Sequence, residues 1–96
     1  MIISFKTKAT QDIYDGVSSK ETRKFPDTIW RVAQRKLDMI NAAVVLADLK
    51  VPPGNRLHPL QGDKKGYHSI SINDQYRIIF QFRDRNAYEV EITDYH

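Results

Sequence analysis

Two histidines and one arginine in this sequence have the side-chain chemistry to cut an RNA chain without a metal ion. Such a cut needs one group that takes a proton from the ribose 2′-hydroxyl and another that protonates the leaving 5′-oxygen. His58 and His96 suit either task, because the ordinary pKa of histidine is about 6.5. Arg77 carries a planar fork of donors that can hold two phosphate oxygens. A single surface histidine is usually just solvated, so it is the combination that favours RNA cleavage.

Other chemistries lack their usual residue patterns. The sequence has no cysteine, which excludes a disulfide framework and a thiolate metal site. Gly62 and Gly66 flank a charged stretch that lacks the Lys-Ser/Thr ending of a phosphate-binding loop, so a hairpin turn is the better interpretation. No serine lies in a nucleophile-elbow pattern, and the histidines and carboxylates show no metal-ligand spacing. We therefore expect no metal ion and no small-molecule cofactor.

Length and charge narrow the class of protein further. The 96 residues, 41% of them hydrophobic, are enough for one modest core, so residues 1–96 are expected to form a single domain. Fifteen Lys and Arg against 12 Asp and Glu leave a formal charge of +3, which suits a polyanionic partner without identifying it. The opening residues lack the pattern of a signal peptide, and no apolar run approaches the roughly 20 residues of a membrane span. We expect a cytoplasmic protein without membrane association.

The N-terminal half predicts a short strand and two helices. Apolar residues within 2–5 indicate a brief first strand, and residues 9–15 indicate a short helix. Asp27 is a plausible N-cap for the longest helix. One apolar face of that helix is formed by residues three or four positions apart, namely Ile29, Ala33, Leu37, Ile40 and Val44. The prolines at 52–53 then force a turn, because proline lacks the amide hydrogen that a helix needs.

The C-terminal half predicts strands. Short runs rich in β-branched and aromatic residues occur at 67–72, 76–82 and 88–93, with a weaker strand at 56–61. The polar breaks at 62–66, 73–74 and 84–86 are only two to five residues long, which favours antiparallel hairpins. The expected fold class is therefore α+β, with helices over one face of a strand meander and the other face open.

Strand alternation separates a core face from an open face in this predicted sheet. The core side of the central strand carries Ile78, Phe80 and Phe82. Its open side carries Arg77, Ile79 and Gln81. The polar side of the preceding strand carries Tyr67, Ser69 and Ser71, whereas His68 lies with Ile70 and Ile72. His68 is therefore expected to be a hydrogen-bonded structural histidine rather than a catalytic one.

Four stretches of the sequence carry a resemblance to a known family: MIISF at 1–5, RLHPLQGDKKGYHSI at 56–70, NDQYRI at 73–78 and DYH at 94–96. They closely resemble HigB toxins of the RelE superfamily, and the likeness runs the full length. It implies a short N-terminal strand, two N-terminal helices and a C-terminal antiparallel meander. It also implies a toxin that enters the ribosomal A site, cleaves translated mRNA without metal and is inhibited by a HigA antitoxin.

Carried over position by position, the resemblance implies a catalytic group of His58, Arg77, Asp94, Tyr95 and His96. In the mechanism that we expect, the 2′-hydroxyl attacks the adjacent phosphorus, Arg77 holds the developing charge, and the two histidines share the proton transfers. Sequence alone does not tell which histidine is the base. Asp94 would orient a histidine, while Tyr95 would stack on a base or hydrogen-bond a phosphate.

Three further residues are expected to bind RNA, namely Gln61, Lys64 and Lys65. Some relatives carry lysine where this chain has Gln61, and an amide can hydrogen-bond a phosphate but cannot neutralise it. Lys64 and Lys65 would compensate from the following turn. The alternative from another class is a non-catalytic module that binds RNA or a protein partner through the same fold.

Overall fold

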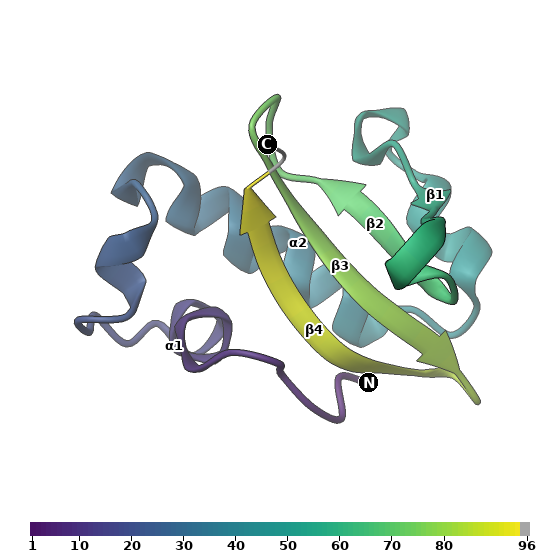
Figure 1. The fold of residues 1–96 in the computed structure, drawn as a ribbon, viewed down its shortest axis with the longest axis horizontal. Helices are drawn as coiled ribbons and strands as arrows, with labels where there is room; N and C mark the ends of the chain where they lie inside the picture. Colours follow the sequence, from purple (N-terminus) through teal and green to yellow (C-terminus); the bar gives the residue numbers. More distant parts are fainter. Residues whose placement is uncertain (95–96) are drawn as a thin grey trace.

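The computed structural model describes residues 1–94 and contains a four-stranded sheet with helices packed on one face (Figure 1). The strands are β1 (His58–Pro59), β2 (Tyr67–Ser71), β3 (Tyr76–Arg83) and β4 (Asn86–Asp94). They follow one another in space as in sequence, and each neighbouring pair is antiparallel. The two α-helices are α1 (Lys8–Asp15) and α2 (Trp30–Ala42). The predicted α+β class and the hairpin meander are thus confirmed.

Short 3₁₀ turns, labelled η, fill the connections. They are η1 (Thr22–Lys24), η2 (Asp27–Ile29), η3 (Leu46–Lys50), η4 (Pro53–Asn55) and η5 (Gly62–Lys64). No helix within residues 1–94 is long and apolar enough to cross a membrane.

The caps of α1 fix both of its ends and tie it to the sheet. The Thr7 hydroxyl accepts a hydrogen bond from the amide of Thr10, which satisfies a free N–H of the first turn. Gly16 ends the helix at φ 73°, a left-handed conformation that glycine adopts without strain. The Thr10 hydroxyl in turn accepts from the amide of Ile92, at 3.0 Å, and so links α1 to β4.

The longest helix begins and ends inside the predicted bounds. Asp27 is not its N-cap, because residues 27–29 form the turn η2 and α2 starts after Ile29 without a side-chain cap. Val44 does not extend the apolar face and is 51% exposed, because the chain leaves the helix at Ala43, which is buried instead. The predicted residues Ala33, Leu37 and Ile40 are fully buried and, with Ile70, Ile78 and Phe80, belong to one hydrophobic cluster between α2 and the sheet.

A β-bulge in β4 changes which residues of that strand face the helices. Between the pairs Ile79↔Glu91 and Gln81↔Tyr88, β4 has one residue more than β3, and Glu89 adopts φ 54°. As a result Ala87 and Val90, three positions apart, are both fully buried. Tyr88 lies opposite Gln81 and therefore shares the open face with it.

The first six residues lie along the outer edge of β4 rather than forming a regular strand. Isolated parallel bridges join Ile2 to Ala87 and Phe5 to Val90. The amide of Lys6 donates to the carbonyl of Val90, at 3.0 Å, so the pairing has real hydrogen bonds. The predicted first strand is thus present only as a pair of bridges.

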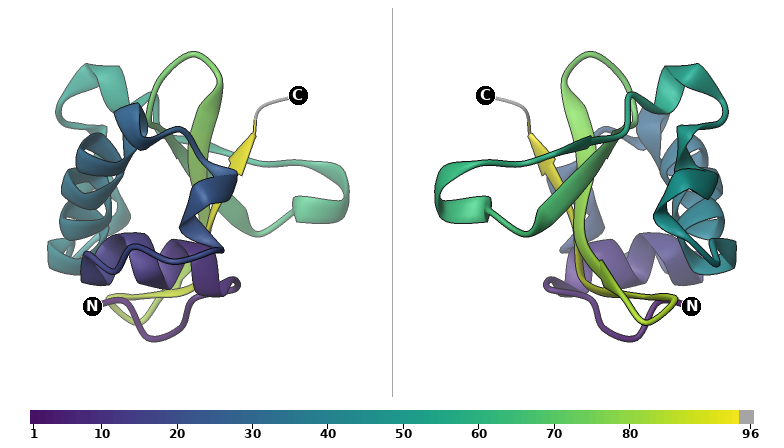
Figure 2. Two further views of the ribbon diagram at one scale, coloured as in Figure 1. Left: turned by 90° about the vertical axis from the view of Figure 1, so that its left-hand side faces the viewer. Right: turned by 90° about the vertical axis from the view of Figure 1, so that its right-hand side faces the viewer.

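The face of the sheet away from α2 is open, and one loop projects from that side (Figure 2). This loop joins β1 to β2 and contains η5. It stands on the opposite side of the sheet from α2, so the open face has a raised border.

Candidate active site

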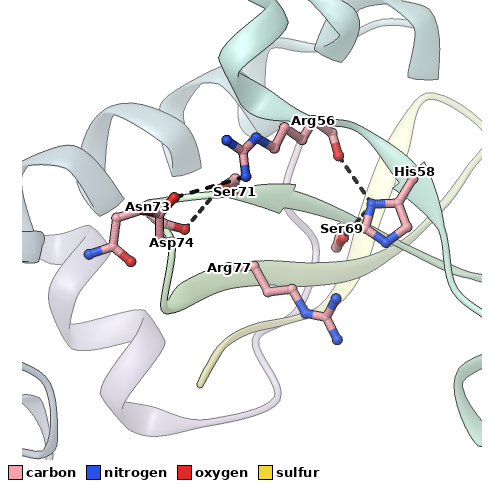
Figure 3. Close-up of a pocket in the computed structure, with 7 residues that line it drawn as sticks. All are labelled: Arg56, His58, Ser69, Ser71, Asn73, Asp74 and Arg77. Carbon is pink, nitrogen blue, oxygen red and sulfur yellow. Dashed lines mark hydrogen bonds and ion pairs between the residues drawn. The ribbon is translucent and has the colours of Figure 1, made fainter. Parts of the chain in front are cut away.

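A cavity of about 450 Å³ lies on the open face where β1, β2 and β3 meet the β2–β3 hairpin. Its lining is polar and comes from both strands and turns: Arg56, His58, Ser69, Ser71, Asn73, Asp74 and Arg77 (Figure 3). Two of the predicted catalytic residues, His58 and Arg77, therefore line the same cavity although they are 19 positions apart in the sequence.

The buried side-chain amide of Asn55 anchors the segment that carries His58. Asn55 is fully buried, and its side-chain NH₂ donates to the carbonyl of Leu49 at 3.1 Å. Its side-chain oxygen accepts from the ammonium group of Lys36 on α2. Burial and the neighbouring Arg35 together lower the pKa of Lys36. Asn55 thus links the turns before β1 to α2, and this link fixes the position of His58.

The contacts of His58 select one form of its neutral ring. Its Nδ1 lies 3.1 Å from the carbonyl oxygen of Arg56 and 3.4 Å from the hydroxyl of Ser69, which is buried directly opposite on β2. A carbonyl oxygen can only accept a hydrogen bond, so the shorter of the two contacts favours the form of the ring with a hydrogen on Nδ1. In the neutral ring Nε2 then keeps its lone pair and can accept a proton.

Arg77 enters the cavity from β3. It is half-buried and pairs with Ser71 in the register, on the face away from the hydrophobic cluster, as predicted. A second guanidinium group, that of Arg56, lies 3.9 Å from the carboxylate of Asp74. Both of these side chains are largely exposed, so the ion pair contributes little to stability. Arg56 can therefore exchange Asp74 for another anion. The cavity can therefore receive a phosphate.

Asp94 lies at the end of β4 and is not part of the cavity lining. It pairs with Tyr76 in the register, and the Gln75 side chain donates to its carboxylate at 3.2 Å. By strand alternation it belongs to the face opposite Arg77. The other two predicted catalytic residues, Tyr95 and His96, lie outside the described residues.

The three residues expected to bind RNA lie in the projecting loop rather than in the cavity. Gln61 precedes η5 and Lys65 follows it, and both are exposed. The ammonium group of Lys64 lies 5.2 Å above the ring of Tyr67. They stay predicted RNA contacts, at the raised border of the open face.

Sequence reasoning did not single out several lining residues. Ser69 and Ser71 could have been included, because strand alternation already places them on the face of Arg77. Arg56 contributes a backbone carbonyl as well as its guanidinium group, and no residue pattern reveals the backbone contact. Asn73 and Asp74 line the cavity because they form the tip of the β2–β3 hairpin, where the Asn73 side chain accepts from the amide of Tyr76 at 2.7 Å.

His68 lies on the core side of β2, as predicted, and lines a second cavity of about 310 Å³. The other lining residues are Leu46, Ala47, Lys50, Leu57, His58 and Pro59. Burial lowers the pKa of His68, and the nearby His58 adds to this effect. Its buried Nδ1 has no hydrogen-bond partner within residues 1–94, so the predicted hydrogen bond is missing at that atom.

This lowered pKa predicts that acid destabilises the protein. Below about pH 6.5 the unfolded chain binds a proton at His68 more readily than the folded protein does, so stability falls as pH drops toward the folded-state pKa. We expect urea denaturation to show a larger loss of stability between pH 7.5 and 5.5 in the wild type than in His68→Gln. Equal losses in the two proteins would assign the acid sensitivity to other groups.

A sequence model of the family described as "RelE-like toxin of type II toxin-antitoxin system HigB" matches residues 3–96. The chain belongs to this HigB-like toxin family. Toxin HigB-1 of Vibrio cholerae serotype O1 is 42% identical over 84 residues, which cover 88% of this chain and 86% of the relative. Endoribonuclease HigB of Proteus vulgaris is 36% identical over 97 residues, which cover 100% of both chains.

Solved structures support the same fold for this HigB-like toxin. YafQ from E. coli superimposes with a TM-score of 0.52 and covers 94% of this chain and 91% of its own, at 17% identity. The YoeB-YefM complex from Staphylococcus aureus gives a TM-score of 0.57 at 13% identity, covering 100% of this chain and 98% of the matched chain. At such identities the likeness shows the fold alone, and it confirms the predicted RelE-like architecture.

Proposed function

We propose that this HigB-like toxin is a ribosome-dependent endoribonuclease that cleaves mRNA in the cavity between His58 and Arg77. The observation that carries the proposal is the convergence of a histidine and an arginine on one polar cavity. The full-length similarity to a protein named Endoribonuclease HigB supports it.

The chemistry proceeds by attack of the ribose 2′-oxygen on the adjacent phosphorus. His58 acts as the base, because its Nε2 is the ring nitrogen left without a hydrogen when Nδ1 donates to Arg56. Arg77 holds the two non-bridging oxygens as negative charge grows on them. The bond from phosphorus to the 5′-oxygen then breaks, which leaves a 2′,3′-cyclic phosphate on one fragment and a free 5′-hydroxyl on the other.

The leaving 5′-oxygen takes its proton from His96, which the family resemblance assigns to this site. Asp94 orients that histidine, and Tyr95 supports a base or a phosphate. Because two histidines move the protons and an arginine balances the charge, the reaction needs no metal ion. Gln61, Lys64 and Lys65 hold the RNA from the projecting loop.

The biological setting follows from the family. We propose that residues 1–96 work as one cytoplasmic toxin domain that acts on mRNA in the ribosomal A site and is inhibited by a HigA-type antitoxin. The net positive charge of the chain favours approach to a ribosome–mRNA complex, because such a complex is densely negative.

The test is to incubate the purified protein with ribosomes stalled on a defined mRNA and to analyse both ends of any fragment. We expect a cut in the A-site codon that yields a 2′,3′-cyclic phosphate and a 5′-hydroxyl. An mRNA with 2′-deoxyribose at the cut position is the matched control and should stay intact. Fragments with a 3′-hydroxyl and a 5′-phosphate would refute attack by the 2′-oxygen, and binding without cleavage would favour the non-catalytic module.

A further inference from the structure

Two tyrosines form a row across the open face, away from the cavity. Tyr67 on β2 and Tyr88 on β4 both pair in the register with Gln81 on β3, one from each side. Directly paired residues point to the same face of a sheet, so the two rings flank the Gln81 side chain. All three side chains are half-buried and therefore still present surface to solvent.

Each ring of this tyrosine row has a cation above it. The ammonium group of Lys64 lies 5.2 Å from the centre of the Tyr67 ring, and the guanidinium carbon of Arg83 lies 3.8 Å from that of Tyr88. An aromatic ring together with a flexible cation is the combination that binds single-stranded nucleic acid, because an arriving base displaces the cation from the ring face and stacks there, while the cation neutralises a phosphate.

The tyrosine row continues the same face as the cavity. Tyr67 is two positions from the cavity residue Ser69, and Gln81 is four positions from Arg77. At the rise of a β-strand, the four positions correspond to about 13 Å. An RNA strand bound in the cavity can cover this distance with the nucleotides next to the cleaved one.

One acidic side chain on this face limits the path of the phosphates. Glu91 pairs with Ile79 and therefore lies on the open face between the cavity and Tyr88. Its carboxylate disfavours a phosphate above the middle of β4. The favourable phosphate positions are then at the two cations, Lys64 on the projecting loop and Arg83 at the β3–β4 turn.

We infer that the tyrosine row is a second RNA subsite, in which Tyr67 and Tyr88 stack unpaired bases that flank the cleaved nucleotide, while Lys64 and Arg83 contact their phosphates. The inference rests on the proposed function for the identity of the ligand. Its occupant is single-stranded RNA, because a duplex keeps its bases stacked on one another and offers no free base to a tyrosine.

The subsite is tested by binding, with a single-stranded oligoribonucleotide that carries 2′-deoxyribose at every position open to cleavage. Tyr67→Leu and Tyr88→Leu should each weaken binding about 5- to 150-fold, the equivalent of 1 to 3 kcal/mol for one stacked base. Tyr67→Phe and Tyr88→Phe are the matched controls and should bind like the wild type, because they keep the ring. Leucine variants that bind as tightly as the wild type would overturn the subsite.

Salt dependence tests the cations separately. Removing one phosphate contact should lower the slope of log affinity against log salt by about 0.7 for a single strand. We expect this change in Arg83→Gln but not in Arg31→Gln, which removes an exposed charge from α2 on the other face. An unchanged slope in Arg83→Gln would overturn its phosphate contact.

Competition experiments identify the kind of molecule that occupies the tyrosine row. Equal binding of double-stranded RNA, or displacement of the oligonucleotide by polyglutamate of the same charge, would show that charge attraction and not stacking holds the RNA. No binding of the single strand by the wild type at low salt would also overturn the inference. Since the RNA cannot be cut, these results do not depend on catalysis: an mRNA that stays intact on ribosomes refutes the proposed function alone.

Discussion

Replacing His58 with glutamine is expected to lower the rate of mRNA cleavage by about 10²–10⁴-fold, the range that a positioned proton-transfer group contributes. The amide fills much of the imidazole volume but cannot take a proton near neutral pH. Folding should be unaffected, because His58 is exposed and its segment is anchored through Asn55. The measurement is the single-turnover rate on stalled ribosomes at equal concentrations of folded protein.

His68→Gln is the matched control for His58→Gln, since His68 lies on the core side of the neighbouring strand. It should cleave at close to the wild-type rate. The tautomer of His58 can be read independently from long-range ¹H–¹⁵N NMR spectra of the neutral protein, which should show a protonated Nδ1. A protonated Nε2, or full activity in His58→Gln, would remove His58 from the role of base.

Replacing Arg77 with alanine is expected to cost at least about 100-fold in cleavage, consistent with roughly 2.7 to 4 kcal/mol for the loss of one charge-stabilising donor. The fold should survive, because the fully buried neighbours Ile78 and Phe80 belong to the hydrophobic cluster and Arg77 does not. Arg77→Lys should fall between the wild type and Arg77→Ala, since an ammonium group keeps the charge but loses the two-pronged geometry.

Arg35→Ala is the control for the loss of one positive charge, because Arg35 is exposed on α2, which packs on the other face of the sheet. It should leave the single-turnover rate nearly unchanged. An Arg77→Ala protein that is folded and fully active would show that the phosphate is held elsewhere, with Arg56 the first residue to examine in that cavity.

The parts of the fold that were predictable are those set by local patterns. The apolar spacing of Ala33, Leu37 and Ile40 marks α2, because a helix brings such positions onto one side. The short polar breaks mark the hairpins, and alternation along β3 assigns Arg77 to the open face. These signals depend on neighbours within a few positions, which the sequence displays directly.

The parts that were missed depend on contacts between distant segments or on unusual backbone conformations. Nothing in the residue type of Glu89 signals a positive φ, yet the bulge there places Tyr88 on the open face beside Gln81. Simple alternation counted back from Glu91 would have assigned Tyr88 to the core. The predicted cap at Asp27 failed for a related reason, since a 3₁₀ turn occupies that position.

The candidate site also has one part that local patterns predict and one part that they do not. His58 and Arg77 were identified by their chemistry, and the structure brings them into one cavity. His58 is held by a backbone carbonyl two residues earlier in the chain and by a serine that strand pairing places opposite, and no motif identifies either group.

The pairing of the first six residues with β4 also governs when this protein can finish folding during synthesis. Ile2 bridges to Ala87 and Phe5 to Val90, so each contact joins segments about 85 positions apart in the chain. A growing chain has no partner for its first residues until residue 90 has left the ribosomal exit tunnel. The helices and the β2–β3 hairpin can form earlier from local contacts, whereas the outer edge of the sheet can form only after β4 is available. The nascent toxin therefore lacks its complete sheet until β4 itself has left the ribosome.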